Sequence, residues 1–218
     1  MSPETELGQD RASLAGLLRG LSIWLDANPG DAGWLGALRF GVAGGFAAAG
    51  DPDLAEAEFR KILDQDPDHP WPWIGLIDIA LLRGDVGAAV AMGQAALQQM
   101  PYHAALRRKT AEAVEQAQWP DAALTVMGGV PDLAHVALED LAYMIGLYRA
   151  AGRVTGAAGL CDRLLAARPD DAQARLARIE IAFANDDGPG AVTAAAQALH
   201  HHPSDPEIIE RAAQAHVL

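Results

Sequence analysis

The chain has 218 residues, half of them hydrophobic and few of them aromatic, with a formal net charge of −13 and a pI near 4.8. Binding the phosphates of nucleic acid depends on clustered Lys and Arg, so this charge balance argues against a nucleic-acid partner. It equally disfavours the helical repeats that read RNA bases.

No targeting or membrane segment is apparent. The first residues include acidic side chains and lack the apolar core of a secretory signal. The longest apolar run, near Trp71 to Leu82, is interrupted by Pro72 and Asp78 and is shorter than the roughly 20 residues that span a bilayer. We therefore expect a soluble, cytoplasmic protein without membrane insertion, although an excised fragment of a longer protein would look the same.

The N-terminal part contains one disordered segment and one helix by its pattern. Residues 1–9 are polar, contain Pro3 and show no periodicity, so we expect them to be disordered. In residues 10–28, leucines and Trp24 recur at helical spacing, and Asn28-Pro29-Gly30 ends the run. We predict a single helix that covers the apolar edge of the first two-helix unit.

A two-helix unit follows and then repeats. A small apolar helix leads to a Gly-Asp turn, and a second helix after the turn ends at a Pro. The same three landmarks return 34 residues later, as Gly50 and Gly84, Ala55 and Ala89, and Pro67 and Pro101.

This arrangement resembles the tetratricopeptide repeat (TPR) family, whose 34-residue unit is helix, turn, helix with a Trp, small residues, an aromatic and a closing Pro at set places. The best match is the second unit, with Trp73 early in its first helix and Ala80 near that helix's end. The fourth unit supplies Tyr148, Gly152 and the Arg168-Pro169 stop. The resemblance implies an all-α fold, a right-handed α-solenoid of about five helix-turn-helix repeats with an N-terminal covering helix and a C-terminal capping helix.

The resemblance also sets the expected boundaries. We predict one solenoid domain over residues 10–218, with repeats at about 31–69, 70–103, 104–131, 132–171 and 172–205. The segment 206–218 corresponds to the first helix of a sixth unit. It is either the closing cap or the point where a longer protein was cut.

Two places depart from the regular pattern. The helix after Asp31, a plausible N-cap, contains several glycines, each of which weakens a helix by up to about 1 kcal/mol relative to Ala: Gly33, Gly36, Gly41, Gly44 and Gly45. Either neighbouring helices approach closely there, which we favour, or a partner's side chain needs the room. In the third unit, Gln118-Trp119 replaces the turn Gly, and Asp132 could cap an early start of the next helix.

No catalytic or metal motif is recovered from the sequence. Asp64, Asp66 and Asp68 imitate the opening of a calcium loop, but Pro67 intrudes and the later ligand positions do not fit. The three consecutive histidines at 200–202 point about 100° apart on a helix and cannot share a metal ion. The single cysteine, Cys161, is expected to be a buried, inert thiol. We predict a non-enzymatic protein with no cofactor and no metal.

The resemblance places the first helix of each unit on a concave face. The expected partner-binding groove there is formed by Phe40, Trp71, Ile74, Asp78, Leu81, Arg108, Glu112, Arg149, Glu180 and Phe183. For Phe40 and Trp71, packing against the N-terminal helix is an open alternative. For Arg108 and Glu112, the alternative is a solvated face with i,i+4 ion pairs. This groove suits an amphipathic helix or an extended peptide with an apolar anchor and a basic portion.

The leading hypothesis is a non-catalytic, bacterial-type TPR module that binds a protein or peptide as an adaptor or assembly scaffold. The Lys, Asn and Arg clamp of the relatives that bind chaperone C-termini is absent, because the matching positions hold Phe40, Gly44, Ile74 and Arg108. The alternative function is a docking or regulatory domain of a larger enzyme, such as a glycosyltransferase or sulfotransferase. Self-association through the ends of the solenoid, giving a homo-oligomer, is a third possibility.

Overall fold

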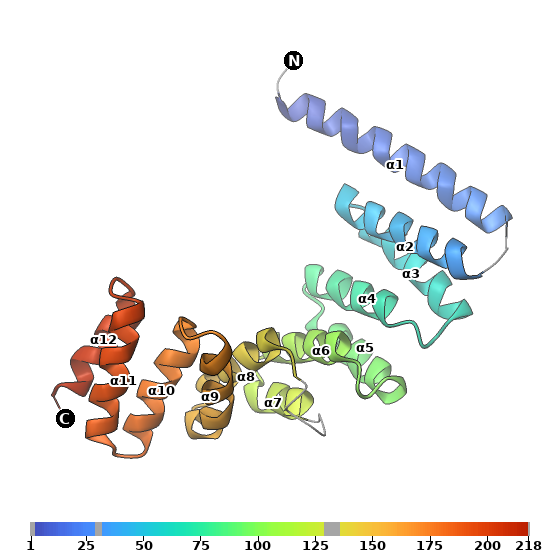
Figure 1. Cartoon of the computed structure of the whole chain (residues 1–218). Coiled ribbons are helices and arrows are strands. Elements are labelled where there is room, and N and C mark those ends of the chain that lie inside the picture. Colours follow the sequence, from blue (N-terminus) through green and yellow to red (C-terminus); the bar gives the residue numbers. More distant parts are fainter. Residues whose placement is uncertain (1–2, 29–31, 129–135, 218) are drawn as a thin grey trace. The chain divides into compact units, whose positions relative to one another are not determined.

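The computed structural model describes residues 3–28, 32–128 and 136–217, which are helical with short connections and contain no strand (Figure 1). The helices of residues 1–117 are α1 (Pro3–Ala27), α2 (Ala32–Ala49), α3 (Pro52–Gln65), α4 (Pro70–Leu82), α5 (Val86–Gln99) and α6 (Ala104–Gln116). Those of residues 118–218 are α7 (Pro120–Gly128), α8 (Leu138–Ala150), the 3₁₀ segment η2 (Val154–Ala157), α9 (Ala158–Ala167), α10 (Ala172–Ala184), α11 (Gly188–His201) and α12 (Pro206–Ala215). Among the described helices, none is both long and apolar enough to cross a bilayer.

The chain divides into two compact units. Unit 1 covers residues 1–117 and unit 2 covers residues 118–218, so the division falls inside the irregular third repeat, between α6 and α7. Within each unit, helices that follow one another in the sequence pack together. A single solenoid domain over residues 10–218 stays a prediction.

The turns inside the repeats share one backbone conformation. A residue one or two positions after the first helix has a positive φ in each of the five repeats, at intervals of 34 residues: Gly50 (84°), Gly84 (74°), Gln118 (62°), Gly152 (65°) and Asp186 (55°). Glycine adopts this left-handed conformation without steric cost, whereas other residues adopt it uncommonly. The third and fifth repeats therefore keep the turn geometry although they lack the glycine.

Side-chain caps start many of the helices. Asp51, Asp85 and Asp187 accept a hydrogen bond from the backbone amide three residues later, at the start of α3, α5 and α11. Asp171 and Asp205 do the same for α10 and α12. Since the first amides of a helix have no partner within the helix, these carboxylates stabilise the starts of both helices of a repeat.

A second recurring bond joins successive repeats. Trp73 Nε1 donates to the Pro67 carbonyl at 3.0 Å, and the Arg175 Nε donates to the Pro169 carbonyl at 2.6 Å. Arg107 donates in the same way to the Pro101 carbonyl. Each donor lies six residues after the proline, and the three donors occupy the same position of their repeats. At the junction between repeats, Trp73 therefore makes the same kind of hydrogen bond that arginine makes in the third and fifth repeats.

The cores of the two units differ in their side chains. In unit 1, Phe46, Phe59 and other large residues of α1 to α4 form an apolar cluster. In unit 2, the cluster of α10 to α12 is built around alanines, with Leu176, Ile179 and Ile208 among them. Small side chains allow close helix packing.

Two expectations about where helices start are corrected. Helix α1 begins at Pro3, so residues 3–9 are helical and not disordered; proline is tolerated in the first turn, where its missing amide has no helical partner. Helix α8 begins at Leu138 after Ala137 as N-cap, so the early start expected near Asp132 is wrong. Asp132 itself, like Asp31, lies outside the described residues.

The favoured explanation of the glycines in α2 is also wrong for most of them. A methyl group added at Gly36, Gly41 or Gly44 would meet no atom within 4 Å, so close helix approach does not require glycine there. Only at Gly45 would it approach a neighbour, the Leu18 side chain, at 2.9 Å. The surroundings of Gly33 lie outside those described.

Candidate partner-binding surfaces

In unit 1, the predicted polar residues of α4 and α6 form one ion-pair chain. Lys109 Nζ lies 2.9 Å from Asp78 Oδ1 and 2.9 Å from Glu112 Oε2, and Arg108 Nε donates to Glu112 Oε1 at 2.8 Å. Burial alone would lower the pKa of Lys109, but its hydrogen bonds to Glu112 and Asp78 raise that pKa above the ordinary value. Asp78, Arg108 and Glu112 are therefore brought together by Lys109, which the sequence analysis did not select.

The predicted apolar residues of unit 1 divide into exposed and packed ones. Trp71 is 50% exposed and meets the His103 ring edge-on, with centroids 6.0 Å apart. Ile74 is half-buried, and Leu81 packs against the buried cluster of α4 to α6. The Phe40 ring lies 5.6 Å from that of Phe59, within the apolar core of α1 to α4. Trp71 is thus available to a partner, whereas Phe40 mainly contributes to packing.

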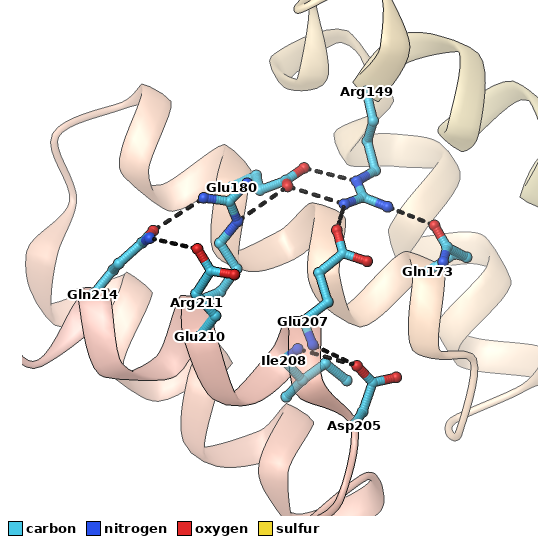
Figure 2. A network of polar contacts seen from close by, with 9 residues as sticks. All are labelled: Arg149, Gln173, Glu180, Asp205, Glu207, Ile208, Glu210, Arg211 and Gln214. Atoms are coloured by element: carbon cyan, nitrogen blue, oxygen red, sulfur yellow. Dashed lines mark hydrogen bonds and ion pairs between the residues drawn. The ribbon is translucent and has the colours of Figure 1, made fainter.

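In unit 2, Arg149 is the centre of a network that spans three helices (Figure 2). From α8, its Nε donates to Glu180 Oε2 at 2.8 Å and its Nη2 to Glu180 Oε1 at 3.0 Å, a two-pronged bond to α10. The same guanidinium donates to Gln173 Oε1 of α10 and to Glu207 Oε1 of α12, each at 2.5 Å. Arg211 Nε of α12 lies 3.5 Å from Glu180 Oε1.

This network is partly shielded from water. The side chains of Arg149 and Glu180 are 16% and 17% exposed. The hydrogen bond to Glu180 is the main reason that the pKa of Arg149 is raised above its ordinary value. Because two-pronged arginine–carboxylate bonds are strong and directional, they hold the three helices in register. Arg149 and Glu180, which the sequence predicted as partner-binding residues, are therefore already paired with each other.

An apolar depression lies beside this network. It has a volume of about 600 Å³ and is lined by Phe183 of α10 and by Glu210, Ala213, Gln214 and Val217 of the α12 region. The sequence analysis selected Phe183 but none of the α12 residues, because it treated that helix only as a cap. Most of the lining is apolar, and Glu210 is its one charged residue. A partner's apolar side chain fits such a space.

A spacing in the sequence connects the residues of these ion pairs. Arg149 and Glu180 are 31 residues apart, and the same interval relates Asp78 to Lys109 and Glu180 to Arg211. A shift of 34 residues, which is one repeat, leads to the equivalent position of the first helix in the next repeat. A shift of 31 residues leads to a position about one turn earlier on the same face of that helix. Opposite charges at this interval were the signal that would have found Lys109 and Arg211.

The described residues contain no group of three or more His, Cys, Asp or Glu side chains that could hold a metal ion. The Cys161 thiol is fully buried, and burial raises its pKa to about 12. In this environment the thiol is not activated as a nucleophile.

Comparison with protein families gives two matches, both to the tetratricopeptide repeat, over residues 46–92 and 147–206. These segments contain the turns of the first, second, fourth and fifth repeats. No curated protein matches the chain.

Solved structures resemble the chain closely in fold. YrrB, a TPR protein with an unusual peptide-binding site, gives a TM-score of 0.69 at 15% identity, over 87% of this chain and 96% of that one. A TPR protein from Parabacteroides merdae ATCC 43184 gives 0.64 at 16% identity, over 83% and 72%. MamA from Desulfovibrio magneticus RS-1, from residue 41 to its end, gives 0.62 at 15% identity, over 81% and 98%. The predicted all-α, TPR-like solenoid fold is thereby confirmed.

Proposed function

Since this chain is a member of the tetratricopeptide repeat family, we propose that it is a non-catalytic module that binds a protein or peptide on the faces formed by its first helices. In unit 2 this face is made by α8, α10 and α12, which carry the Arg149 network and the apolar depression. An adaptor or assembly-scaffold role follows from this proposal. YrrB, which resembles this chain in fold, has an unusual peptide-binding site, which is in keeping with such a role.

The single observation that carries the proposal is the apolar depression lined by Phe183 and Ala213. Burying apolar surface contributes about 25 cal/mol per Å², so one aliphatic or aromatic side chain placed there would contribute on the order of 1.5 to 3 kcal/mol. Neighbouring polar groups are fixed by the Arg149–Glu180 bonds, so the flank of the depression is already ordered before a partner arrives.

The charge at the edge of the depression favours a basic residue next to the apolar anchor. Glu210 accepts a hydrogen bond from the Gln214 amide at 3.4 Å, and in the described part of the chain no Lys or Arg pairs with it. The whole chain is strongly acidic. Complementary charge increases association rates and selects partners. The proposed ligand is therefore a peptide segment with an apolar anchor beside Lys or Arg.

A second contact region is proposed in unit 1. Trp71, in the first turn of α4, is half exposed next to His103, the N-cap of α6. The Asp78–Lys109–Glu112 ion pairs join the same two helices. Exposed tryptophans are frequent anchors of protein interfaces. Ile74, Leu81 and Arg108 would flank this contact. A cytoplasmic location, a bacterial origin and self-association stay predictions from the sequence.

The test is selection from a displayed library of random peptides, followed by titration of the selected peptides. We expect enrichment of an aromatic or aliphatic residue adjacent to Lys or Arg. Ala213→Arg, which fills the depression at an exposed position, should abolish binding, and Glu210→Gln should weaken it. Ile209→Ser, an exposed position of the same helix that does not line the depression, is the matched control and should bind normally.

Two results would contradict the proposal. Peptides selected on the parent that bind Ala213→Arg equally well would show that the depression is not the site. Failure to enrich any sequence, with a folded protein confirmed by circular dichroism, would argue against a peptide-binding module.

A further inference from the structure

A polar cavity lies on the other side of α10, away from the Arg149 network. Its volume is about 330 Å³, and it is lined by residues of three helices: Asp162 and Leu165 of α9, Arg175 and Arg178 of α10, and Gly190, Thr193, Ala194 and Gln197 of α11. Arg178 and Glu180 are two residues apart, about 200° around the helix, so they lie on opposite sides of α10. The cavity is thus separate from the proposed partner-binding face.

Arg175 is the feature that distinguishes this cavity. The residue is only 9% exposed, and its Nε donates to the Pro169 carbonyl at 2.6 Å. In the described residues no carboxylate makes an ion pair with it, although the charge of Asp170 acts on it, and its terminal nitrogens are not among the fully buried atoms that lack a partner, so a ligand in the cavity can reach them. Burial accordingly lowers its pKa from the ordinary value of arginine. A largely buried guanidinium that has no carboxylate partner keeps its terminal N–H groups available, and an anion in the cavity would pair with them.

Other donors converge on the same space. Arg178 lies one turn after Arg175 and makes an ion pair with Asp162 at 2.9 Å, in which both side chains are largely exposed. Exposed pairs of this kind contribute little, so Arg178 can turn toward a ligand at small cost. The Gln197 amide lines the cavity as well. These three side chains offer planar, multiple N–H donors, which is the geometry that oxyanions prefer.

The cavity also opens toward a histidine cluster. A neighbouring pocket shares Arg175 and Gln197 and adds His200 and His201. Some desolvation, followed by the positive charge of Arg175, holds the pKa of His201 below its ordinary value. In a chain with a net charge of −13, Arg175 and Arg178 thus lie on one cavity, with the carboxylates of Asp162 and Asp170 beside them.

From this arrangement we propose that the cavity between α9, α10 and α11 is an oxyanion-binding site for a phosphate or carboxylate group. Arg175 provides the buried donor fork, Arg178 the second cation and Gln197 a neutral donor. Asp162, the one carboxylate on the lining, is neutralised by Arg178 until the ligand displaces it. The site is independent of the proposed peptide-binding face, so either can exist without the other.

The test is titration of the whole chain with inorganic phosphate at constant ionic strength, followed by amide NMR signals of residues 190–201. We expect saturable binding. Arg175→Gln should weaken it at least about tenfold, since hydrogen bonds to charged groups contribute about this much. Arg107→Gln is the matched control, because Arg107 occupies the same repeat position and makes the same bond to a proline carbonyl, Pro101. It should bind phosphate with the affinity of the parent.

A parallel titration with acetate separates the two sources of the oxyanion: equal affinity assigns the site to carboxylates, and weaker binding of acetate assigns it to phosphates. The proposal is overturned if the parent shows no saturable shift with either anion, or if Arg107→Gln weakens binding as much as Arg175→Gln does. If Arg175→Gln does not fold, the phosphate affinities of Arg178→Gln and Gln197→Leu replace it as the test. Both residues lie at exposed positions, so these variants should fold. Unchanged phosphate affinity in both would also overturn it.

Discussion

Replacement of Glu58 by Leu is expected to destabilise unit 1 strongly. The Glu58 residue is 2% exposed, and its carboxylate accepts hydrogen bonds from Arg39 at 2.6 Å, from Lys61 at 2.7 Å and from the Ser22 hydroxyl at 2.8 Å. The Arg39 side chain is itself only 8% exposed, and its other partner, Asp26, is 48% exposed. Glu58→Leu therefore leaves a buried guanidinium with one solvent-accessible carboxylate.

The cost can be worked from these contacts. Breaking a buried ion pair on one side costs about 3 to 5 kcal/mol, and the remaining bond from Arg39 to Asp26 places the expected value near the lower limit. A loss of about 3 kcal/mol corresponds to a fall in Tm of roughly 10 °C for a unit of this size. In the double variant Arg39→Leu/Glu58→Leu, no unpaired charge is left, and most of the stability should return.

The assay is urea unfolding followed by tryptophan fluorescence, which reports mainly on unit 1 because every tryptophan except Trp119 lies there. Arg60→Gln is the control, since Arg60 is 60% exposed in its ion pair with Glu56 on the same helix, α3. It should cost no more than about 0.5 kcal/mol. If Glu58→Leu is as mild as Arg60→Gln, the buried pair does not support the fold as argued.

Three further outcomes are expected. With its pKa raised to about 12 by burial, Cys161 should resist a thiol reagent at pH 8 until urea unfolds unit 2. A raised thiol pKa favours the folded state only while the thiol is protonated. The contribution of Cys161 to the free energy of unfolding should therefore decline as the pH rises above about 8.5. His103→Asp should raise the stability of unit 1 to urea by about 0.5 to 1 kcal/mol, since the imidazole Nδ1 now accepts the capping bond from the Leu106 amide at 3.3 Å and aspartate is a stronger cap. Gly93→Ala should lower the free energy of unfolding by about 1 to 3 kcal/mol, because the new methyl group would lie 2.5 Å from the Thr110 hydroxyl. Gly44→Ala, in open space, should raise it by about 0.5 to 1 kcal/mol, and urea unfolding checks both values.

The ends of several helices and their turns were predictable because local residues determine them. Asp66-Pro67 and Met100-Pro101 end α3 and α5 within two residues of the expected stops, and the Gly50 and Gly84 turns lie where the pattern put them. These signals act through backbone conformation and capping, which depend on few neighbours. Gln118 shows the limit of this approach, because its side chain does not favour the left-handed conformation that the turn between the flanking helices requires.

The candidate site was predictable only in part. Periodicity identified Asp78, Arg149 and Glu180 as residues of the first helices, but which side chains meet depends on how those helices are offset. Phe40 illustrates this dependence, since its half-buried ring packs against Phe59 of α3. The depression beside Phe183 escaped prediction because its lining comes mostly from α12, which no repeat pattern marked as a binding element.

The interval of 31 residues explains why the paired residues are poor candidates for direct recognition. It aligns opposite charges on adjacent first helices, as in Asp78–Lys109 and Arg149–Glu180, so each charge is satisfied before a partner arrives. A ligand that used these groups would have to break existing bonds and would gain little. Recognition is therefore expected from groups that take no part in these ion pairs. Examples are the exposed Trp71 in unit 1 and Glu210 of the depression in unit 2.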